Sequence, residues 1–580
     1  MMFKRLLALS VVCSMVLAAC GQAAPTPDAP QDQGGTGQAG AVADGDRDFI
    51  TFEWYFNYDW FNPLPWGDDL ITAHWGEMFN VHVETRAPDA TPTEVLNLMI
   101  VADNLPDVIW MERDDHNAEM TRLGLFYSID ELVAMVDNNW YHENVPASTQ
   151  SFYEVDGVNH VIPNWVRAGV IGQLGEATGG NWAWLKTTNL HEAVGSPSFT
   201  TFEDLYAYAV AARDAGLTDS GGAAVIPVLF NGGQDYGQDF VNMIYRSFGG
   251  ATTGWGDWFG IKPDGTFGTR WDNWVWREAV LEANRWHREG LFPATNLTNT
   301  PDQFRENLMS GRAALIVHDH SDDNTHSWRR ILRENDPGNS IEVIISQQTG
   351  DDIFLFPPAR GLAHTDINSD THGTLGWNGS FITRSAEHPG RIFEVLTWML
   401  TPLGSVEMMF GPQGELWDDL TPEGFPILHA FPDALPAAEH ERIGIWRWNN
   451  HGHSNHVDNA KFAANAAIPE EYRNWVDLMQ ATLFTPRQRL SDEFQILALT
   501  IDSTEPLGIN RTMIIDHFEM MLPQVILAST AEEAEALFDS VVDFAFSHGM
   551  AEIEERYSAQ WEENKARQGG SVFAPHPLTR

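Results

Sequence analysis

The chain has 580 residues and a formal net charge of −47, with 34 Lys and Arg residues against 81 Asp and Glu residues. Its length predicts two or more domains, and its hydrophobic content of 43% indicates a globular protein instead of a disordered or membrane-spanning one. Because few cations are available to displace counterions from phosphates, the composition also argues against nucleic acid as a partner.

Residues 1–20 have the pattern of a lipoprotein signal peptide. Lys4 and Arg5 precede an apolar run that ends in Leu-Ala-Ala-Cys20, which resembles a bacterial lipobox. Lipidation of Cys20 would hold the protein at the outer face of the bacterial cytoplasmic membrane. The alternative is an ordinary signal peptide with a chance cysteine. Residues 21–48 are rich in Pro, Gly, Gln and Asp, which predicts a flexible tether.

Strand and helix patterns alternate in the first part of the body. Residues 47–56, 81–87 and 105–111 have the pattern of strands, and residues 67–80 and 91–104 have helical spacing. Strand-helix-strand-helix-strand order predicts an α/β fold with a parallel sheet.

Further along the chain, residues 153–163 are typical of a hairpin that turns at Asp156-Gly157. Residues 200–216 and 271–290 have helical patterns, and the second ends in Gly290, a helix-stop signal. Residues 301–319 predict a helix, a Ser-Gly turn and a strand. The last 130 residues are mainly helical and loop-like in pattern.

The stretch "EWYFNYDWFNPLPW" (Glu53–Trp66) places seven aromatic residues in fourteen, directly at the end of the first predicted strand. In parallel sheets, ligands bind beyond the carboxyl ends of the strands. Flat rings and nearby polar side chains suit sugars, which offer C–H faces and hydroxyl groups. Core packing is the competing interpretation for any single Trp, and it is preferred for Trp274, Trp276 and Trp286. The candidate ligand-binding residues are Trp54, Tyr55, Asp59, Trp60, Trp110, Glu112, Trp165, Arg167, Trp182, Trp377, Asn378, Trp446 and Trp448.

Histidine clusters and acidic pairs are weaker signals. We interpret His451, His453 and His456, and the pair His318 and His320, as solvated histidines in polar loops, with a metal site as the alternative. Adjacent carboxylates arise by chance in so acidic a chain and do not predict a glycosidase. We therefore expect no catalytic residue, no metal and no cofactor.

The order of several segments resembles that of a known family. "ITFEWYF", "EVLNLMIVADNLPDVIW", "YEVDGVNHVIPN", "FRENLMSGRAALIV" and "GSFITRSAEHPGRIFEVLTWM" resemble segments of extracellular solute-binding proteins (family 1 type), in particular the long lipoprotein branch of carbohydrate ABC importers. The resemblance runs from Cys20 to about Trp417. It implies a two-lobe fold like that of periplasmic binding proteins, each lobe a mainly parallel sheet flanked by helices, with a ligand cleft between the lobes. Residues 214–227 lack the alternating oxygen donors of the calcium loop that many long relatives carry.

These observations predict a monomeric, non-enzymatic lipoprotein that captures an oligosaccharide by hinge closure and delivers it to ABC permease subunits. The alternatives are a lipid-anchored glycan-degrading enzyme and a peptide-binding lipoprotein. The predicted division is a signal peptide (1–20), a tether (21–48), a first lobe (49–163 and 304–377) and a second lobe (164–303 and 378–580, with a helical extension).

Overall fold

The computed structural model describes residues 47–59, 61, 63–136, 139–166, 182–219, 221–250, 258–319, 323–344, 371–448, 451–469, 473, 489–490, 492–494, 501–567 and 570. The chain divides into two compact units, Met1–Ala43 and Asp44–Arg580, and every described residue belongs to the second. The predicted signal peptide, the lipidation site Cys20 and nearly all of the predicted tether lie outside the described residues.

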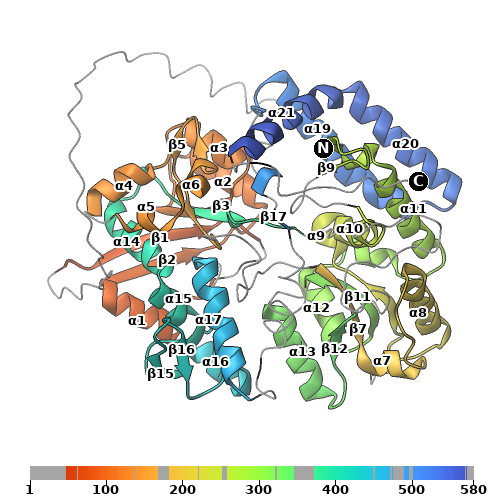
Figure 1. Ribbon diagram of the computed structural model, residues 1–580, viewed down its shortest axis with the longest axis horizontal. Coiled ribbons are helices and arrows are strands. Elements are labelled where there is room, and N and C mark those ends of the chain that lie inside the picture. Colours follow the sequence, from red (N-terminus) through yellow and green to blue (C-terminus); the bar gives the residue numbers. More distant parts are fainter. Residues whose placement is uncertain are drawn as a thin grey trace. The chain divides into compact units, whose positions relative to one another are not determined.

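The first of two main sheets has the strand order β2-β1-β3-β14-β6 (Figure 1). β1 (Ile50–Phe56) pairs in parallel with β2 (Val81–Arg86) and with β3 (Val108–Glu112). β14 (Asn378–Ile382) runs antiparallel to both β3 and β6 (Ile162–Pro163). The three parallel strands predicted from the sequence are confirmed, and two strands from distant parts of the chain complete the sheet.

Helix ends in this region follow the local sequence. In α1 (Leu70–Phe79), the Asp69 side chain accepts a hydrogen bond from the Thr72 amide, and Asn80 ends the helix in the left-handed conformation. In α2 (Pro92–Val101), a proline occupies the first turn, where a missing N–H costs nothing. The other helices and hairpins around this sheet are α3 (Asp115–Arg122), α4 (Ile129–Val136), α5 (Trp140–Asn144), α6 (Ala147–Ser151), α14 (Pro389–Met399), α15 (Pro402–Phe410), α16 (Ala437–Ile443), α17 (Ser454–Ala467), β4 (Glu154–Val155) with β5 (Val158–Asn159), and β15 (Trp417–Leu420) with β16 (Pro426–Leu428).

The second sheet has the order β12-β7-β11-β8. β8 (Ile226–Leu229) and β11 (Ala313–Asp319) are parallel, whereas β7 (Trp182–Thr187) is antiparallel to β11 and to β12 (Ile341–Val343). Around it lie α7 (Thr188–Ala193), α8 (Phe202–Asp214), α9 (Gly232–Asp235), α10 (Gln238–Ser247), α11 (Trp274–Arg288), α12 (Pro301–Met309), α13 (Asp323–Asn335), the hairpin β9 (Phe259–Ile261) with β10 (Phe267–Thr269), and the C-terminal helices α19 (Pro506–Ile526), α20 (Ala531–Ser547) and α21 (Met550–Arg567).

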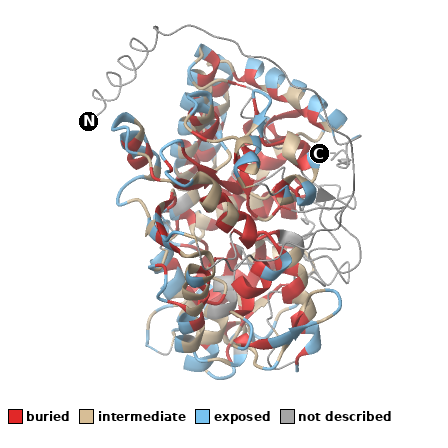
Figure 2. Ribbon diagram, turned by 90° about the vertical axis from the view of Figure 1, so that its left-hand side faces the viewer, coloured by how far each residue is buried: buried red, intermediate tan, exposed pale blue. Residues whose placement is uncertain are grey.

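Each sheet has its own core, which defines a first and a second lobe. Figure 2 shows buried residues running along the strands, with exposed residues on the outer faces of the helices. The first core contains β1, β3 and α14, and a small cluster under α15 and α17 adjoins this lobe. The second core joins α10 and α11 to the C-terminal helices α19, α20 and α21. Trp276 and Trp286 are fully buried there, and Trp274 packs against the same core, as predicted.

Strand pairing differs from the predicted division of the chain. We expected residues 304–377 in the first lobe, but β11 and β12 pair with β7 in the second sheet. We expected residues 378–580 in the second lobe, but β14 pairs with β3 in the first. A strand pattern predicts that a strand forms and does not identify its partner, because pairing depends on contacts far apart in sequence.

The chain passes between the lobes in three segments that contact one another. The first follows β6, the second precedes β14, and the third contains the short helix η10 (Asp492–Phe494). Val166 forms an isolated antiparallel bridge with Leu375, and β13 (Thr371–His372) pairs with β17 (Arg489–Leu490). The Asp492 carboxylate accepts hydrogen bonds from the amide and the hydroxyl of Thr374. The crossing segments are therefore joined to one another by backbone and side-chain hydrogen bonds.

Candidate functional site

Eight rings gather where the parallel strands of the first sheet end, and we call this group the aromatic edge. β1 and β3 end here, and the antiparallel strand β14 begins here, so residues from three parts of the chain meet at one sheet edge. Phe56 lies opposite Trp110 in the strand register, and Trp110 lies opposite Ser380. The rings belong to Trp54, Phe56, Tyr58, Phe61, Trp110, Trp377, Trp448 and His451.

Trp110 is the centre of this group. Its ring centroid lies 4.5 Å from that of Tyr58, 5.1 Å from that of Phe61 and 5.5 Å from that of Trp377. The interplanar angles are between 58° and 71°, which is the tilted or edge-to-face geometry that aromatic rings prefer. Trp54 stacks on Trp448 with centroids 5.6 Å apart. The sequence prediction thus named four residues that do come together: Trp54, Trp110, Trp377 and Trp448.

The rings of the aromatic edge differ in exposure. Trp54 and Trp110 have no exposed surface, and Trp448 is 2% exposed. Phe61 and Trp377 are only half-buried. The outer rings therefore keep part of their surface exposed, whereas the inner rings support them from below.

Polar side chains border the outer rings. Glu112 ends β3 and lies opposite Asn378, the first residue of β14. Both side chains interact with the Tyr58 hydroxyl. Burial, followed by the charge of Asp114, raises the pKa of Glu112 to about 8. The Glu112 carboxyl is therefore mainly protonated at neutral pH and can donate as well as accept a hydrogen bond.

One asparagine connects this edge to the first crossing segment. The Asn164 side-chain oxygen accepts hydrogen bonds from the backbone amides of Trp377 (3.2 Å) and Asn378 (3.0 Å). Gly376 has φ +65°, and a Cβ there would lie 1.7 Å from the Asn164 carbonyl oxygen. The Arg113 guanidinium donates to the Gly376 carbonyl and lies 5.1 Å from the Tyr153 ring centroid. These contacts fix Trp377 at the junction between a strand and a crossing segment.

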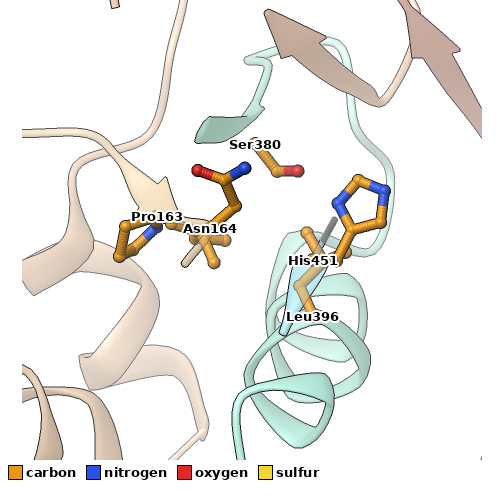
Figure 3. Close-up of a pocket in the computed structure, with 6 residues that line it drawn as sticks. Pro163, Asn164, Ser380, Leu396 and His451 are labelled. Atoms are coloured by element: carbon orange, nitrogen blue, oxygen red, sulfur yellow. The ribbon is translucent and has the colours of Figure 1, made fainter. Parts of the chain in front are cut away.

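A small pocket lies beside Asn164. It is lined by Ile162, Pro163, Asn164, Ser380, Leu396 and His451. Figure 3 shows the Asn164 amide and the Ser380 hydroxyl beside each other, with the His451 ring across from them. The pocket is sized for about one water molecule and is too small for a sugar ring.

The histidines differ from the prediction of solvated side chains. His451 is 6% exposed and His453 is 2% exposed. The His451 ring centroid lies 4.5 Å from that of Trp54 and 4.9 Å from that of Trp110, and burial lowers the pKa of His451 to about 3. His318 is likewise buried, with a pKa lowered to about 3, and His320 lies outside the described residues. Within the described part of the chain, no group of three or more His, Cys, Asp or Glu side chains is arranged to hold a metal ion.

The second sheet has a comparable edge with fewer rings. β8 and β11 end there, and the antiparallel strand β7 begins there with the half-buried Trp182. The Trp182 ring centroid lies 5.8 Å from that of His318. In both sheets, then, a half-buried tryptophan lies at the start of an antiparallel strand, where parallel neighbours end.

The remaining predicted site residues have other surroundings. Tyr55 points to the opposite face of β1 from Trp54, where its hydroxyl donates to Asn57 and Arg86 lies 5.5 Å from its ring centroid. Asp59 is exposed. Trp165 and Trp446 are half-buried and flank Lys461. Trp60 and Arg167 lie outside the described residues.

Sequence reasoning missed four residues of this region: Tyr58, Phe61, Asn164 and Lys461. Tyr58 and Phe61 stood inside the aromatic stretch already singled out, so their position after β1 was an available signal. Asn164 follows the predicted hairpin directly, but its contact with Trp377 spans more than 200 residues. Lys461 lies on a helix with no sequence feature that marks it.

Comparisons with known proteins give structural matches alone. No protein-family model matches the sequence, and no curated protein does so. The fold is similar to that of FusA, an ABC-transporter substrate-binding protein of S. pneumoniae in complex with kestose, at 15% identity and a TM-score of 0.63, covering 89% of this chain and 100% of that one. It is also similar to the alginate-binding protein AlgQ2 (14% identity, TM-score 0.58, covering 88% and 98%) and to the N-glycan transport solute-binding protein NgtS of Streptococcus pneumoniae (11% identity, TM-score 0.56, covering 89% and 99%).

Among the described residues, no helix is long and apolar enough to cross a membrane. The predicted α/β fold is confirmed, although each sheet also contains antiparallel pairs that the sequence did not predict. The chain therefore has the two-lobe fold of the solute-binding proteins that serve ABC transporters for sugars.

Proposed function

We propose that this protein is the membrane-anchored, extracellular substrate-binding component of an ABC importer, and that it captures an oligosaccharide and delivers it to the permease. The observation that carries the proposal is the aromatic edge, where half-buried rings lie beside polar groups at the carboxyl ends of parallel strands. The solved structures with the same fold include proteins described as bound to kestose or to an N-glycan fragment.

The glycan stacks on the outer rings. Trp377 and Phe61 offer faces for the C–H groups of a sugar ring, and Trp110 holds both of them from below. Glu112, which is half-buried at the end of β3, supplies hydrogen bonds to sugar hydroxyls. Trp182, at the corresponding edge of the second sheet, provides the contact from the other lobe.

The crossing segments supply the hinge. A ligand that contacts both lobes stabilises the closed arrangement, because it gains contacts there that the open arrangement lacks. The contacts of Asn164 with Trp377 and Asn378 couple one crossing segment to the aromatic edge. Closure then reports the bound glycan to the permease, and no chemical step takes place.

The charges near the site favour a neutral glycan. The Arg113 guanidinium is engaged by the Gly376 carbonyl and the Tyr153 ring, and Lys461 is 3% exposed. Glu112 is mainly neutral at physiological pH. A polyuronate would therefore meet the exposed carboxylate of Asp114 beside the aromatic edge, which disfavours an acidic glycan.

Thermal unfolding against a panel of kestose, milk-type oligosaccharides, N-glycans and alginate oligosaccharides tests the proposal. A glycan at a hundred times its dissociation constant stabilises the folded protein by about 2.7 kcal/mol. We expect a neutral oligosaccharide to raise the unfolding temperature and to be recovered intact afterwards. Recovery of cleaved glycan would indicate an enzyme. If no glycan of the panel raises the unfolding temperature and a peptide does, the sugar assignment is overturned.

The membrane anchor has its own test. We expect the wild-type protein, expressed in a bacterium, to incorporate labelled fatty acid and to sediment with membranes. Cys20→Ala should abolish both. Equal labelling of the two proteins would contradict lipidation at Cys20.

A further inference from the structure

Two tryptophans have a backbone conformation that large side chains rarely adopt. Trp165 has φ +44° and Trp446 has φ +69°, in the left-handed region. This conformation costs a non-glycine residue roughly 1–2 kcal/mol, and such strain persists only where the surroundings enforce it. The other non-glycine residues with positive φ among those described are Asn80, Asp103, Asp156, Ser196 and Tyr236, and most of these have short polar side chains that tolerate it.

A buried lysine lies between the two rings. The Lys461 ammonium nitrogen lies 4.2 Å from the ring centroid of Trp446 and 5.9 Å from that of Trp165. Both distances are within the range of a cation–π interaction. Lys461 is 3% exposed, whereas the two rings are half-buried. The ammonium therefore lies beneath the rings, which keep surface open to solvent.

Both rings are next in the chain, or nearly so, to residues that form or hold the aromatic edge. Trp165 directly follows Asn164, whose side chain holds Trp377, and the Trp165 amide donates to the Gly452 carbonyl. Trp446 lies two residues before Trp448, which stacks on Trp54. Three separate parts of the chain, the first crossing segment, the 444–448 turn and α17, thus meet at Lys461.

We propose that Lys461 is a positioning residue that holds Trp165 and Trp446 as a second stacking surface for the glycan, beside the aromatic edge. This inference rests on the proposed function. A buried ammonium is costly to desolvate, and a residue such as Met would fill the same space without that cost. Two strained tryptophans and one buried cation in contact are together better explained by a need for fixed rings than by packing alone.

The surface formed by these rings takes a neutral sugar. The Lys461 side chain is buried, so the ammonium acts on the ligand through the rings and does not pair with a carboxylate of the ligand. A cation on one face of an indole leaves the opposite face available for the C–H groups of a sugar. The two stacking surfaces together extend the site beyond a single sugar ring, which favours an oligosaccharide over a monosaccharide.

Fluorine NMR of the full chain labelled with 5-fluorotryptophan tests the positioning role without a ligand. Trp165→Phe and Trp446→Phe assign the two signals. We expect Lys461→Met to shift or broaden both signals and Lys461→Arg to restore them. Asp458 is buried one turn earlier on α17. All proteins compared carry Asp458→Asn, so that replacing Lys461 by Met does not leave a buried negative charge in the same region.

Lys565 provides the matched control. Its ammonium lies 3.8 Å from the Trp561 ring centroid on α21, which packs on the core of the second lobe. Lys565→Met should shift the Trp561 signal and leave those of Trp165 and Trp446 unchanged. Unchanged Trp165 and Trp446 signals in the Lys461→Met variant would overturn the positioning role.

Binding of kestose, or of the panel glycan that stabilises the wild-type protein most, tests the role in recognition. We expect Lys461→Met to weaken binding about tenfold, Lys461→Arg to recover most of it and Lys565→Met to leave it unchanged. Full affinity in the Lys461→Met variant would overturn the inference while leaving the proposed function intact. If no glycan binds the wild-type protein, the proposed function fails, and the NMR result still decides the positioning role.

Discussion

Both lobes contain a cluster of buried tryptophan rings, but the residues around the two clusters differ. In the second lobe, Trp184, Trp276 and Trp286 are fully buried, and the Trp184 indole N–H donates to the Ser247 hydroxyl. Aliphatic and aromatic side chains surround these rings. In the first lobe, Trp54 and Trp110 are equally buried but continue outward into half-buried Trp377 and Phe61, beside Glu112 and Asn378.

The comparison shows that the number of tryptophans does not identify a binding site. What distinguishes the first cluster is the larger number of rings at the ends of parallel strands and the polar groups beside them. Burial of a ring stabilises the fold in both lobes, since each buried aromatic side chain removes a large apolar area from water. A half-buried ring on a buried layer differs from these, because part of its surface remains exposed while the rings below hold it in place.

The largest expected effect is that of replacing a fully buried tryptophan in each lobe, which compares the loss of stability with the loss of binding. Trp286→Ala and Trp110→Ala should each lower the free energy of unfolding by about 3–5 kcal/mol, because each substitution leaves a cavity in a close-packed core. Only Trp110→Ala should also weaken glycan binding by the folded protein. Chemical unfolding and titration calorimetry measure the two quantities. Equal glycan affinities in the two variants would contradict the claim that only the tryptophan cluster of the first lobe contributes to binding.

The next effect concerns the crossing segment beside the first cluster. Gly376→Ala should lower the free energy of unfolding by at least about 2 kcal/mol, because the residue has φ +65° and its Cβ would clash with the Asn164 carbonyl oxygen. Gly265→Ala is the control, since that residue has φ +85° with nothing within 4 Å. A loss of stability no larger than that of the control would show that Asn164 and Gly376 are not held in close contact.

A half-buried ring gives a smaller effect on folding and a clear one on binding. Trp377→Ala should weaken glycan binding by about tenfold, equivalent to about 1.4 kcal/mol, with a loss of stability well below that of Trp110→Ala. Trp274→Ala, a half-buried tryptophan on the second-lobe core, is the matched control and should leave binding unchanged. The same affinity in both variants would argue against stacking on Trp377.

The last test of the first cluster is a pH dependence. The pKa of Glu112 is raised from 4.5 to about 8, so the folded protein keeps a proton that the unfolded chain has lost in this interval. Its contribution to stability is therefore full below pH 4.5 and is lost as the pH rises through 8. Asp492 acts in the same direction, with a pKa raised from 3.8 to about 6.

Between pH 6 and pH 8, the difference between the wild-type protein and Glu112→Gln reports the contribution of Glu112, because Asp492 and the buried histidines titrate in both proteins. Glu112→Gln should flatten the decline in unfolding temperature over this range, because the amide cannot ionise. An unchanged decline in the variant would mean that Glu112 ionises normally in the folded protein.

Local sequence predicted much of this fold. The elements from β1 to β3 were predicted because hydrophobic periodicity marks the strands and helices and Pro92 marks the start of α2, whereas the Asp69 cap of α1 was not predicted. The division of the chain into lobes was not predicted correctly, because the pairing of β14 with β3 and of β11 with β7 joins residues more than 100 positions apart. Sequence likewise identified the aromatic stretch, but not which rings stay half-buried or that His451 is buried among them.

The most direct measurement is the crystal structure of the complex with the glycan that stabilises the protein most. The account predicts a sugar ring in van der Waals contact with Trp377 and a hydroxyl within hydrogen-bond distance of Glu112. It also predicts a further sugar ring against Trp165 or Trp446. A glycan bound elsewhere, with the aromatic edge still exposed to solvent, would contradict the central claim.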